Sequence, residues 1–300
     1  MATILDETPR PLILPHAGTR TVRSPADGFD YRIYCALPTQ PPPDAGYPAI
    51  FLLDANATFL TTVEAMRMRA ARQASTGVSP AVVVGIGYDT DGPYDQNRRI
   101  YDFSLPHTTD RPRAGGMPRP TGGALALAQF IIGTVRPLIA REIPLDAERQ
   151  ALFGHSLGAY FVLSRLLLAP HDFQTYVAIS PSVWWDEDWL HAGTHGLDAR
   201  IGAAISPRRL LIAVGEYEQC LAPWQQTLPE RDRVITLRRE RAMVDRSRHI
   251  ARRIAERGRE RIAVRFEEMP GEDHSSAALT GISRGLRLAL WQDAAVLRNL

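Results

Sequence analysis

The chain has 300 residues, of which 45% are hydrophobic and 23% charged, a balance ordinary for a globular protein large enough to bury its own core. Its net charge of +2 gives no sign of nucleic-acid binding, and its two cysteines, Cys35 and Cys220, form neither a disulfide framework nor a metal cluster. All 35 basic residues are arginine, which excludes mechanisms that need a lysine, such as a Schiff base.

The first predicted elements are two strands, 12–22 and 29–37. The turn residues 25–28 separate them, so we expect an antiparallel hairpin at one edge of a sheet. Residues 1–7 lack the basic start and apolar run of a cleaved signal, and we expect none. No window of about 18 uninterrupted apolar residues occurs, so no membrane span is expected either.

Further along the chain, predicted strands alternate with predicted helices. The strands are 49–53, 81–86, 149–153, 175–180, 209–214 and 261–269, and the helices are 59–74, 124–142, 157–168, 238–258 and 277–297. We expect Pro137 to kink or end the second of these helices. The alternation predicts an α/β fold with a mostly parallel sheet, helices on both faces and one domain over 1–300. Its active site would lie at the carboxyl ends of the strands.

The stretch 87–123 interrupts this alternation with several prolines and glycines. A loop of this length inside a compact domain is uncommon and is usually functional. We therefore interpret 87–123 as a candidate lid, with the glycine pairs 115–116 and 122–123 as candidate hinges.

The sequence Gly154-His155-Ser156-Leu157-Gly158 joins the strand 149–153 to the helix 157–168. A bare Gly-x-Ser-x-Gly is common by chance, but in a strand-to-helix turn the serine Oγ stands exposed above the sheet edge. The glycines allow the tight turn, and the start of the helix favours a developing negative charge. We predict that Ser156 is a nucleophile.

A base is predicted at His274, which follows the last strand within a glycine-containing turn. A serine hydroxyl is a weak nucleophile and needs a base to take its proton, while a carboxylate holds the other imidazole nitrogen. Glu216 and Glu218 follow the strand 209–214 and would share one face of an extended segment, so periodicity does not separate them. We favour Glu218 because it reaches further over the sheet edge, and we leave Glu216 or a dispensable acid open. The resulting order of serine, acid and histidine is that of α/β-hydrolases.

The alternatives to these choices are weaker. Residues 186–188 form a second acidic group, and Asp273 is expected to cap its turn. His191 and His195 have the spacing of a metal-binding pair but no third ligand, and the His155 side chain is expected to point away from the nucleophile. The remaining histidines are interpreted as surface or packing residues: His16, His107, His171 and His249.

Two backbone amides are expected to stabilise the tetrahedral oxyanion. One comes from Leu157, directly after the nucleophile, and the other from the loop that follows the strand 49–53, where we favour the amide of Asn56. No phosphate loop, dinucleotide fingerprint or zinc pattern occurs, so we expect neither a cofactor nor a metal.

The chain resembles the esterase D-like group of α/β-hydrolases, and within it the enterochelin esterase-like and siderophore (trilactone) esterase branch. The segments that carry the resemblance are Leu52-Leu53-Asp54-Ala55-Asn56, Gly85-Ile86-Gly87-Tyr88, Arg98-Arg99-Ile100-Tyr101-Asp102-Phe103, Gly122-Gly123-Ala124, the Ser156 turn, Ser180-Pro181-Ser182-Val183-Trp184-Trp185 and Val214-Gly215-Glu216-Tyr217-Glu218. The resemblance implies hydrolysis of esters, in some members the backbone of a cyclic catecholate siderophore, and allows a weak acid partner. Since the periplasmic members carry an export signal, it also implies a cytoplasmic enzyme here.

Arginines and tryptophans bear on the substrate. Residues 231–261 hold twelve arginines against five acidic residues, which indicates either a solvated helix face or a basic rim that steers an anionic substrate. Arg98 and Arg99 are predicted to bind substrate in the same way. Trp184 and Trp185 would offer flat faces to aromatic rings, with core packing as the competing role.

The leading hypothesis is a serine esterase acting on a medium-sized anionic ester, such as a ferric catecholate siderophore trilactone. A carbohydrate acetyl or feruloyl esterase, or a small-ester or thioester hydrolase, would use the same residues. A ligand-binding protein that kept the fold but lost turnover is the non-enzymatic alternative, against which the complete set of serine, histidine and acid argues. The sequence leaves the oligomeric state open.

Overall fold

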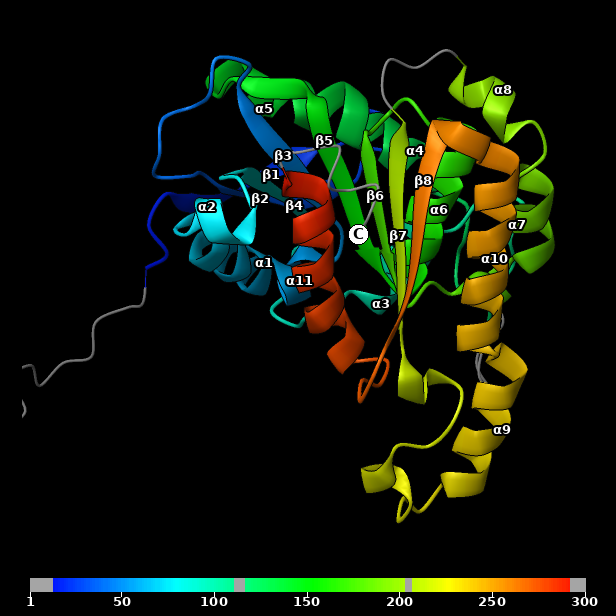
Figure 1. The fold of residues 1–300 in the computed structure, drawn as a ribbon. Coiled ribbons are helices and arrows are strands. Elements are labelled where there is room, and N and C mark those ends of the chain that lie inside the picture. The colour runs from blue at the N-terminus through cyan, green and yellow to red at the C-terminus, as the bar shows by residue number, and fades with distance from the viewer. Residues whose placement is uncertain (1–12, 111–116, 203–206, 292–300) are drawn as a thin grey trace, which may run out of the picture.

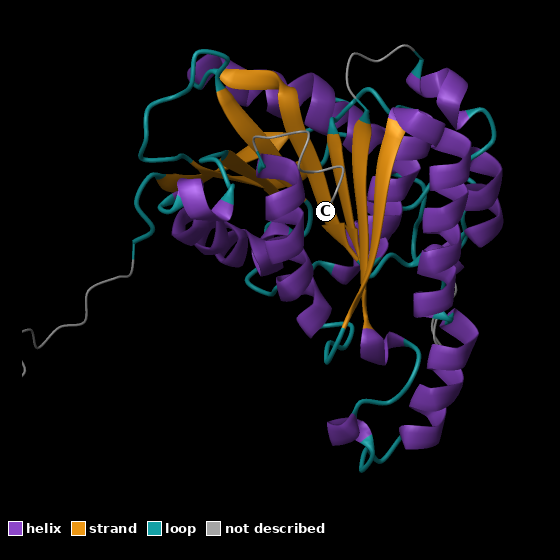
Figure 2. Cartoon of the chain, viewed as in Figure 1, coloured by secondary structure: helices purple, strands orange, loops and turns teal. Residues whose placement is uncertain are grey.

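The computed structural model describes residues 13–110, 117–202 and 207–291. In this part of the chain eight strands form one sheet, in the order β1-β2-β4-β3-β5-β6-β7-β8 (Figures 1 and 2). The strands are β1 (Ala17–Arg23), β2 (Asp30–Ala36), β3 (Tyr47–Leu52), β4 (Val82–Gly87), β5 (Leu145–His155), β6 (Thr175–Ile179), β7 (Arg208–Gly215) and β8 (Ile262–Met269). β2 pairs antiparallel with β1 and β4, and all other pairs are parallel. The predicted mostly parallel sheet with an antiparallel edge hairpin is therefore confirmed.

Helices cover both faces of the sheet (Figure 2). The α-helices are α1 (Ala55–Ala70), α2 (Gln73–Thr76), α3 (Gln96–Phe103), α4 (Ala124–Phe130), α5 (Arg136–Glu142), α6 (Leu157–Leu168), α7 (Glu187–Gly193), α8 (Leu197–Ile201), α9 (Arg231–Arg241), α10 (Met243–Gly258) and α11 (Ser276–Leu290). Successive strand residues serve opposite faces: Phe51 packs in the cluster under α4 and α6, whereas Ile50 packs in the cluster under α1 and α11. Both side chains are fully buried, which explains why the central strands are continuous apolar runs.

Helix α11 lies unusually close to the sheet. A Cβ atom added at Gly281 would lie 2.6 Å from Ile179, and one at Gly285 would lie 2.6 Å from Phe153. The two glycines, four residues apart on one face of the helix, let its backbone approach β5 and β6. This approach brings the loop that precedes α11 over the carboxyl ends of the same strands.

Several predicted elements have other bounds in the structure: β1 begins at Ala17 and not at residue 12, β5 begins at Leu145 and not at 149, and α11 ends at Leu290 and not at 297. Three further differences have a local cause. α1 begins at Ala55, four residues before the predicted start, because Asp54 takes a left-handed conformation (φ 52°) that turns the chain directly from β3 into the helix. The predicted helix 238–258 is part of two helices, α9 and α10, which are separated by Ala242 with φ 42°. The predicted loop 87–123 contains α3, whose N-cap Asp95 accepts hydrogen bonds from the amides of Asn97 and Arg98. Part of the candidate lid, including the glycine pair 115–116, lies outside the described residues.

The predicted helix 124–142 does not end at Pro137, because α5 continues through this residue to Glu142. A π-helical turn, Ile131–Val135, joins α4 to α5 just before the proline. Pro137 has no N–H to donate, and it stands at the second position of α5, directly after the π-helical turn. By length and apolar composition alone, the run Ala124–Glu142 could cross a membrane, a test that core helices of globular proteins also pass. Here Phe130 and Ile139 are fully buried in the core beside the sheet.

Candidate active site

Ser156 lies at the sharp turn between β5 and α6, as the sequence predicts. Its backbone has φ 59° and ψ −118°, a conformation that a residue with a side chain rarely adopts. The turn needs glycine at position 154, because a Cβ atom there would lie 2.4 Å from the carbonyl oxygen of Gly158. The Ser156 amide still donates to the Ile179 carbonyl at 2.9 Å, so the turn stays attached to β6. The strain is thus held by the surrounding backbone, as is common at active sites.

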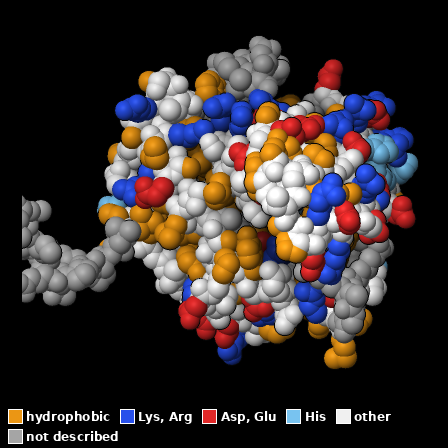
Figure 3. Space-filling view, turned by 90° about the horizontal axis from the view of Figure 1, so that it is seen from below, with side chains coloured by type: hydrophobic (Ala, Val, Ile, Leu, Met, Phe, Trp, Pro, Cys, Tyr) orange, Lys and Arg blue, Asp and Glu red, His pale blue; other side chains and the backbone are white. Residues whose placement is uncertain are grey.

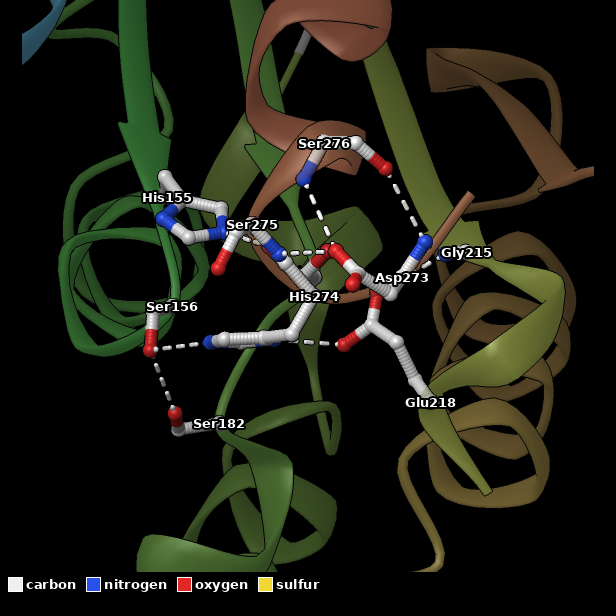
Figure 4. Close-up of polar contacts among 10 residues, drawn as sticks. His155, Ser156, Ser182, Gly215, Glu218, Asp273, His274, Ser275 and Ser276 are labelled. Carbon is white, nitrogen blue, oxygen red and sulfur yellow. Dashed lines mark hydrogen bonds and ion pairs between the residues drawn. The ribbon is translucent and has the colours of Figure 1, made fainter. Parts of the chain in front are cut away.

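Three predicted side chains come together in one hydrogen-bonded row (Figure 4). Ser156 Oγ lies 3.1 Å from His274 Nε2, and His274 Nδ1 lies 2.6 Å from Glu218 Oε2. With Nδ1 protonated toward the carboxylate, Nε2 is left to accept the hydroxyl proton. The chain brings these residues together from the ends of β5, β7 and β8.

Of the two candidate glutamates, only Glu218 faces His274. Its carboxylate is buried, with 1% of the side chain exposed. Glu216 instead contacts the start of the loop that carries His274, where its Oε2 accepts the amide of Gly271 at 2.8 Å. Asp273 accepts the amides of Ser275 and Ser276 and so caps the start of α11, in line with its expected role.

Two serines of the segment after β6 extend the row at both ends. Ser182 Oγ lies 3.4 Å from Ser156 Oγ, and Ser180 Oγ donates to Glu218 Oε1 at 2.5 Å. Sequence reasoning did not place them in the site. The available signal was their position directly after a buried strand, where polar residues gather at the active edge of a parallel sheet.

His155 does not point away from the site as expected. Its Nε2 lies 2.8 Å from the main-chain carbonyl of His274, and the two rings are 4.7 Å apart. Burial, with a smaller contribution from His274, lowers the pKa of His155 to about 3, so the imidazole is neutral. Its Nε2 therefore carries the proton that it donates to the carbonyl.

The starts of α1 and α6, the helices that carry the two predicted oxyanion donors, lie side by side. A Cβ atom added at Gly158 would lie 3.5 Å from Asp54 Oδ2, the N-cap residue of α1. The amides of Asn56 and Leu157 belong to the first turns of these helices, where N–H groups have no partner within the helix. The side chain of Asn56 is engaged elsewhere: it accepts the Tyr88 amide at 2.8 Å and so ties α1 to the end of β4.

The structure gives the arginines of α3 internal partners. Arg99 is buried and makes two hydrogen bonds to Asp54, of 3.1 and 2.9 Å. Burial lowers the pKa of Arg99, but the pair with Asp54 outweighs burial and holds it above the usual value. Arg98 stacks on Phe29 at 3.9 Å and contacts Asp102 at 3.5 Å. This geometry favours a structural role for both, with Arg99 holding the start of α1, over the predicted contact with substrate.

The two tryptophans after β6 differ in exposure. Trp185 is 9% exposed and packs in the core, so the competing role applies to it. Trp184 is half-buried, and the guanidinium of Arg241 lies 4.4 Å from its ring centroid. Of the two, only Trp184 is exposed enough to offer a flat face to an aromatic ring of the substrate, and it lies two residues after Ser182.

Other candidate groups lie apart from the row. Asp186 accepts a hydrogen bond from Tyr160 and contacts His107, and Glu187 pairs with Arg246. Among the described residues no group of three or more histidine, cysteine, aspartate or glutamate side chains is arranged to hold a metal ion.

Beyond the carboxyl ends of the strands, α9 and the chain that leads to it extend past the sheet (Figure 1). No residue of α9 is buried, and Trp224 in the preceding segment is 58% exposed. Seen from this end, arginines, acidic side chains and hydrophobic side chains lie interspersed over the face (Figure 3). This end of the molecule is therefore partly apolar, with charged side chains of both signs.

An eight-stranded, mostly parallel sheet with antiparallel N-terminal strands and a serine at the β5–α6 turn defines an α/β-hydrolase fold. The chain belongs to the esterase family described as "Putative esterase", whose model matches residues 24–261. It is accordingly an esterase.

Relatives and solved structures agree with this assignment. The chain is 37% identical to the ferri-bacillibactin esterase BesA of Bacillus subtilis over 93% of its own length and 91% of that protein. It is 32% identical to the siderophore triacetylfusarinine C esterase of Aspergillus fumigatus over 80% of each chain. A crystal structure of the BES protein from Bacillus cereus superposes with a TM-score of 0.83 at 30% identity, covering 95% of this chain and 100% of that one.

Proposed function

We propose that this esterase hydrolyses its substrate with Ser156 as nucleophile, His274 as general base and acid, and Glu218 as the carboxylate that orients His274. The observation that carries the proposal is the continuous row of hydrogen bonds from Ser156 Oγ through His274 to Glu218, with distances of 3.1 and 2.6 Å. Distances in this range let a proton pass to the imidazole as the oxygen attacks.

In the first half of the reaction, Ser156 Oγ bonds to the ester carbonyl carbon and its proton moves to His274 Nε2. The carbonyl oxygen becomes an oxyanion facing the amides of Leu157 and Asn56. The imidazolium, stabilised by Glu218, then donates its proton to the leaving alcohol oxygen as the C–O bond breaks. In the second half, a water oxygen bonds to the acyl carbon while its proton moves to His274 Nε2. The imidazolium then returns this proton to Ser156 Oγ as the bond from Oγ to the acyl carbon breaks, which releases the acid and restores the enzyme.

For the substrate, we propose a siderophore ester, with a ferric catecholate trilactone as the leading candidate. Two relatives that align along most of this chain are named as siderophore esterases, one of them for ferri-bacillibactin. The arginines of α9 and the Arg241–Trp184 stack suit a large anionic ligand with aromatic rings. In a cyclic trilactone the leaving hydroxyl remains joined to the acyl part, so the first cleavage opens the ring.

Two experiments test the proposal. A fluorophosphonate probe should label the wild-type protein and leave Ser156→Ala unlabelled; equal labelling of both would remove Ser156 as nucleophile. Purified enzyme should then be given a ferric trilactone siderophore, the iron-free siderophore, a feruloyl sugar ester and 4-nitrophenyl acetate. A kcat/KM for the feruloyl or 4-nitrophenyl ester that matches or exceeds that for both siderophore forms would overturn the substrate assignment and leave the serine mechanism in place.

A further inference from the structure

The residue that follows β6 combines three features that rarely occur together. Ser180 is fully buried, its φ is 49° although it is not glycine, and its Oγ lies 2.5 Å from Glu218 Oε1. Its amide also donates to the Ala213 carbonyl at 2.7 Å, so the chain turns while still attached to β7. A left-handed serine persists only where its surroundings hold it, and such residues concentrate at functional sites.

The two oxygens of the Glu218 carboxylate have different partners. Oε1 accepts the Ser180 hydroxyl and the amide of Gly215, the latter at 2.7 Å. Oε2 is left for His274 Nδ1 at 2.6 Å. Rotation of the carboxylate would break two hydrogen bonds in a buried place, where unmade bonds are costly. Figure 4 shows the Glu218 carboxylate between Gly215 and His274.

We propose that Ser180 is a positioning residue for ester hydrolysis: with the Gly215 amide, its hydroxyl fixes Glu218 so that Oε2 holds the His274 imidazole in line with Ser156. Ser180 acts through Glu218 and does not touch the reacting atoms. The inference rests on the proposed function of Ser156, His274 and Glu218. It assigns a role to the left-handed turn after β6, which the family motif around Ser156 does not include.

The physical reason concerns the moment of proton transfer. When His274 takes the Ser156 proton it becomes a cation, and the attraction between its Nδ1–H and Oε2 increases. A carboxylate already held by two other donors needs no rearrangement at that moment, which is the benefit of a preorganised site. Without the Ser180 hydroxyl, Oε1 keeps one donor and the carboxylate gains freedom to turn.

The test uses 4-nitrophenyl acetate hydrolysis by the full chain. Ser180→Ala removes the hydroxyl, and Ser180→Gly removes it while also relieving the left-handed backbone. We expect kcat to fall about 10-fold in both variants, with KM changed less than about twofold, because the loss acts on the transition state. Ser247→Ala is the matched control: Ser247 is also fully buried, and its hydroxyl has no partner among the described residues.

The decisive comparison is a double-mutant cycle with Glu218→Gln. In that background Ser180→Ala should change kcat less than about twofold, because a residue that acts through Glu218 has nothing left to position. If the two effects multiply instead, or if Ser180→Gly keeps the wild-type kcat, Ser180 has only a packing role. Ser156→Ala is run in the same assay: if it retains wild-type activity, the proposed function fails and the role of Ser180 fails with it.

Discussion

The imidazole of His155 donates a 2.8 Å hydrogen bond to the main-chain carbonyl of His274, 119 residues further along the chain. The neighbour of the nucleophile thus holds the loop that carries the base. The bond requires a proton on Nε2 and a neutral ring that fits a buried site. Burial keeps the ring neutral by lowering the pKa of His155 to about 3.

This lowered pKa makes the stability of the protein depend on pH. Between about pH 6.5 and 3, His155 is protonated in the unfolded chain and neutral in the folded chain. The contribution of His155 to the free energy of unfolding is therefore fully present above about pH 6.5 and is lost as the pH falls. The loss is at most about 1.4 kcal/mol per pH unit. In His155→Gln, whose amide can still donate to the carbonyl, urea unfolding should show a shallower decline in stability between pH 7 and 4. The exposed His195→Gln is the control, and an unchanged decline in His155→Gln would contradict the prediction.

Glu216 and Glu218 offer a matched pair of substitutions. Glu218→Gln removes the charge that faces His274 and should lower kcat by about 10²–10⁴-fold, as loss of the orienting carboxylate does in serine hydrolases. Glu216→Gln removes a charge that does not face His274 and leaves an amide oxygen able to accept the Gly271 amide, so it should cost less than about fivefold. Steady-state kinetics with 4-nitrophenyl acetate measures both. The reverse ranking would make Glu216 the acid.

The buried pair of Arg99 and Asp54 should be important for stability. Arg99→Met leaves the Asp54 carboxylate, 2% exposed, without its bidentate partner and should lower the free energy of unfolding by about 3–5 kcal/mol. Adding Asp54→Asn should recover at least half of this loss, because the uncompensated charge is gone. Urea denaturation measures both variants.

An exposed ion pair provides the control for that experiment. Arg20 and Glu142 form a bidentate pair with side chains 44% and 45% exposed, and Arg20→Met should cost no more than about 1 kcal/mol. If Arg99→Met is as mild as Arg20→Met, the start of α1 does not depend on the Arg99–Asp54 pair.

The Arg241–Trp184 stack leads to a prediction about substrate charge. Arg241→Gln removes the cation that lies 4.4 Å from the Trp184 ring and should raise KM for an anionic aromatic ester several-fold, with little change for its neutral counterpart. The wild-type kcat/KM for the anionic ester should also fall as salt rises from about 50 to 500 mM.

Arg257→Gln removes the same charge near the far end of α10 and should leave both KM values unchanged. Equal effects of Arg241→Gln and Arg257→Gln on KM would mean that the net charge of the protein, and not the Arg241–Trp184 stack, attracts the anionic ester. If neither salt nor either substitution affects the anionic ester, electrostatic attraction of the substrate is excluded.

Much of the fold follows from local sequence patterns. The continuous apolar run 49–53 predicts a strand buried on both faces, and β3 (Tyr47–Leu52) covers most of it. The helix 157–168 is predicted with both ends as they occur in α6, because the glycine turn before it is a strong signal. The prediction was wrong where a single residue in the left-handed region decided an element boundary, at Asp54 and at Ala242. Neither residue is glycine, so no local signal marked the turn.

The sequence by itself determined the class of the protein: alternating strands and helices, a serine between glycines at a strand end, and a serine, acid and histidine in that order. Hydrophobic periodicity and turn chemistry are local properties, so they can be read from the chain. Only the tertiary structure decided that Glu218 and not Glu216 meets His274, that Arg99 turns inward to Asp54, and that Ser180 supports the carboxylate. These contacts depend on the directions of side chains at the ends of separate strands, which are set by how the loops pack against one another.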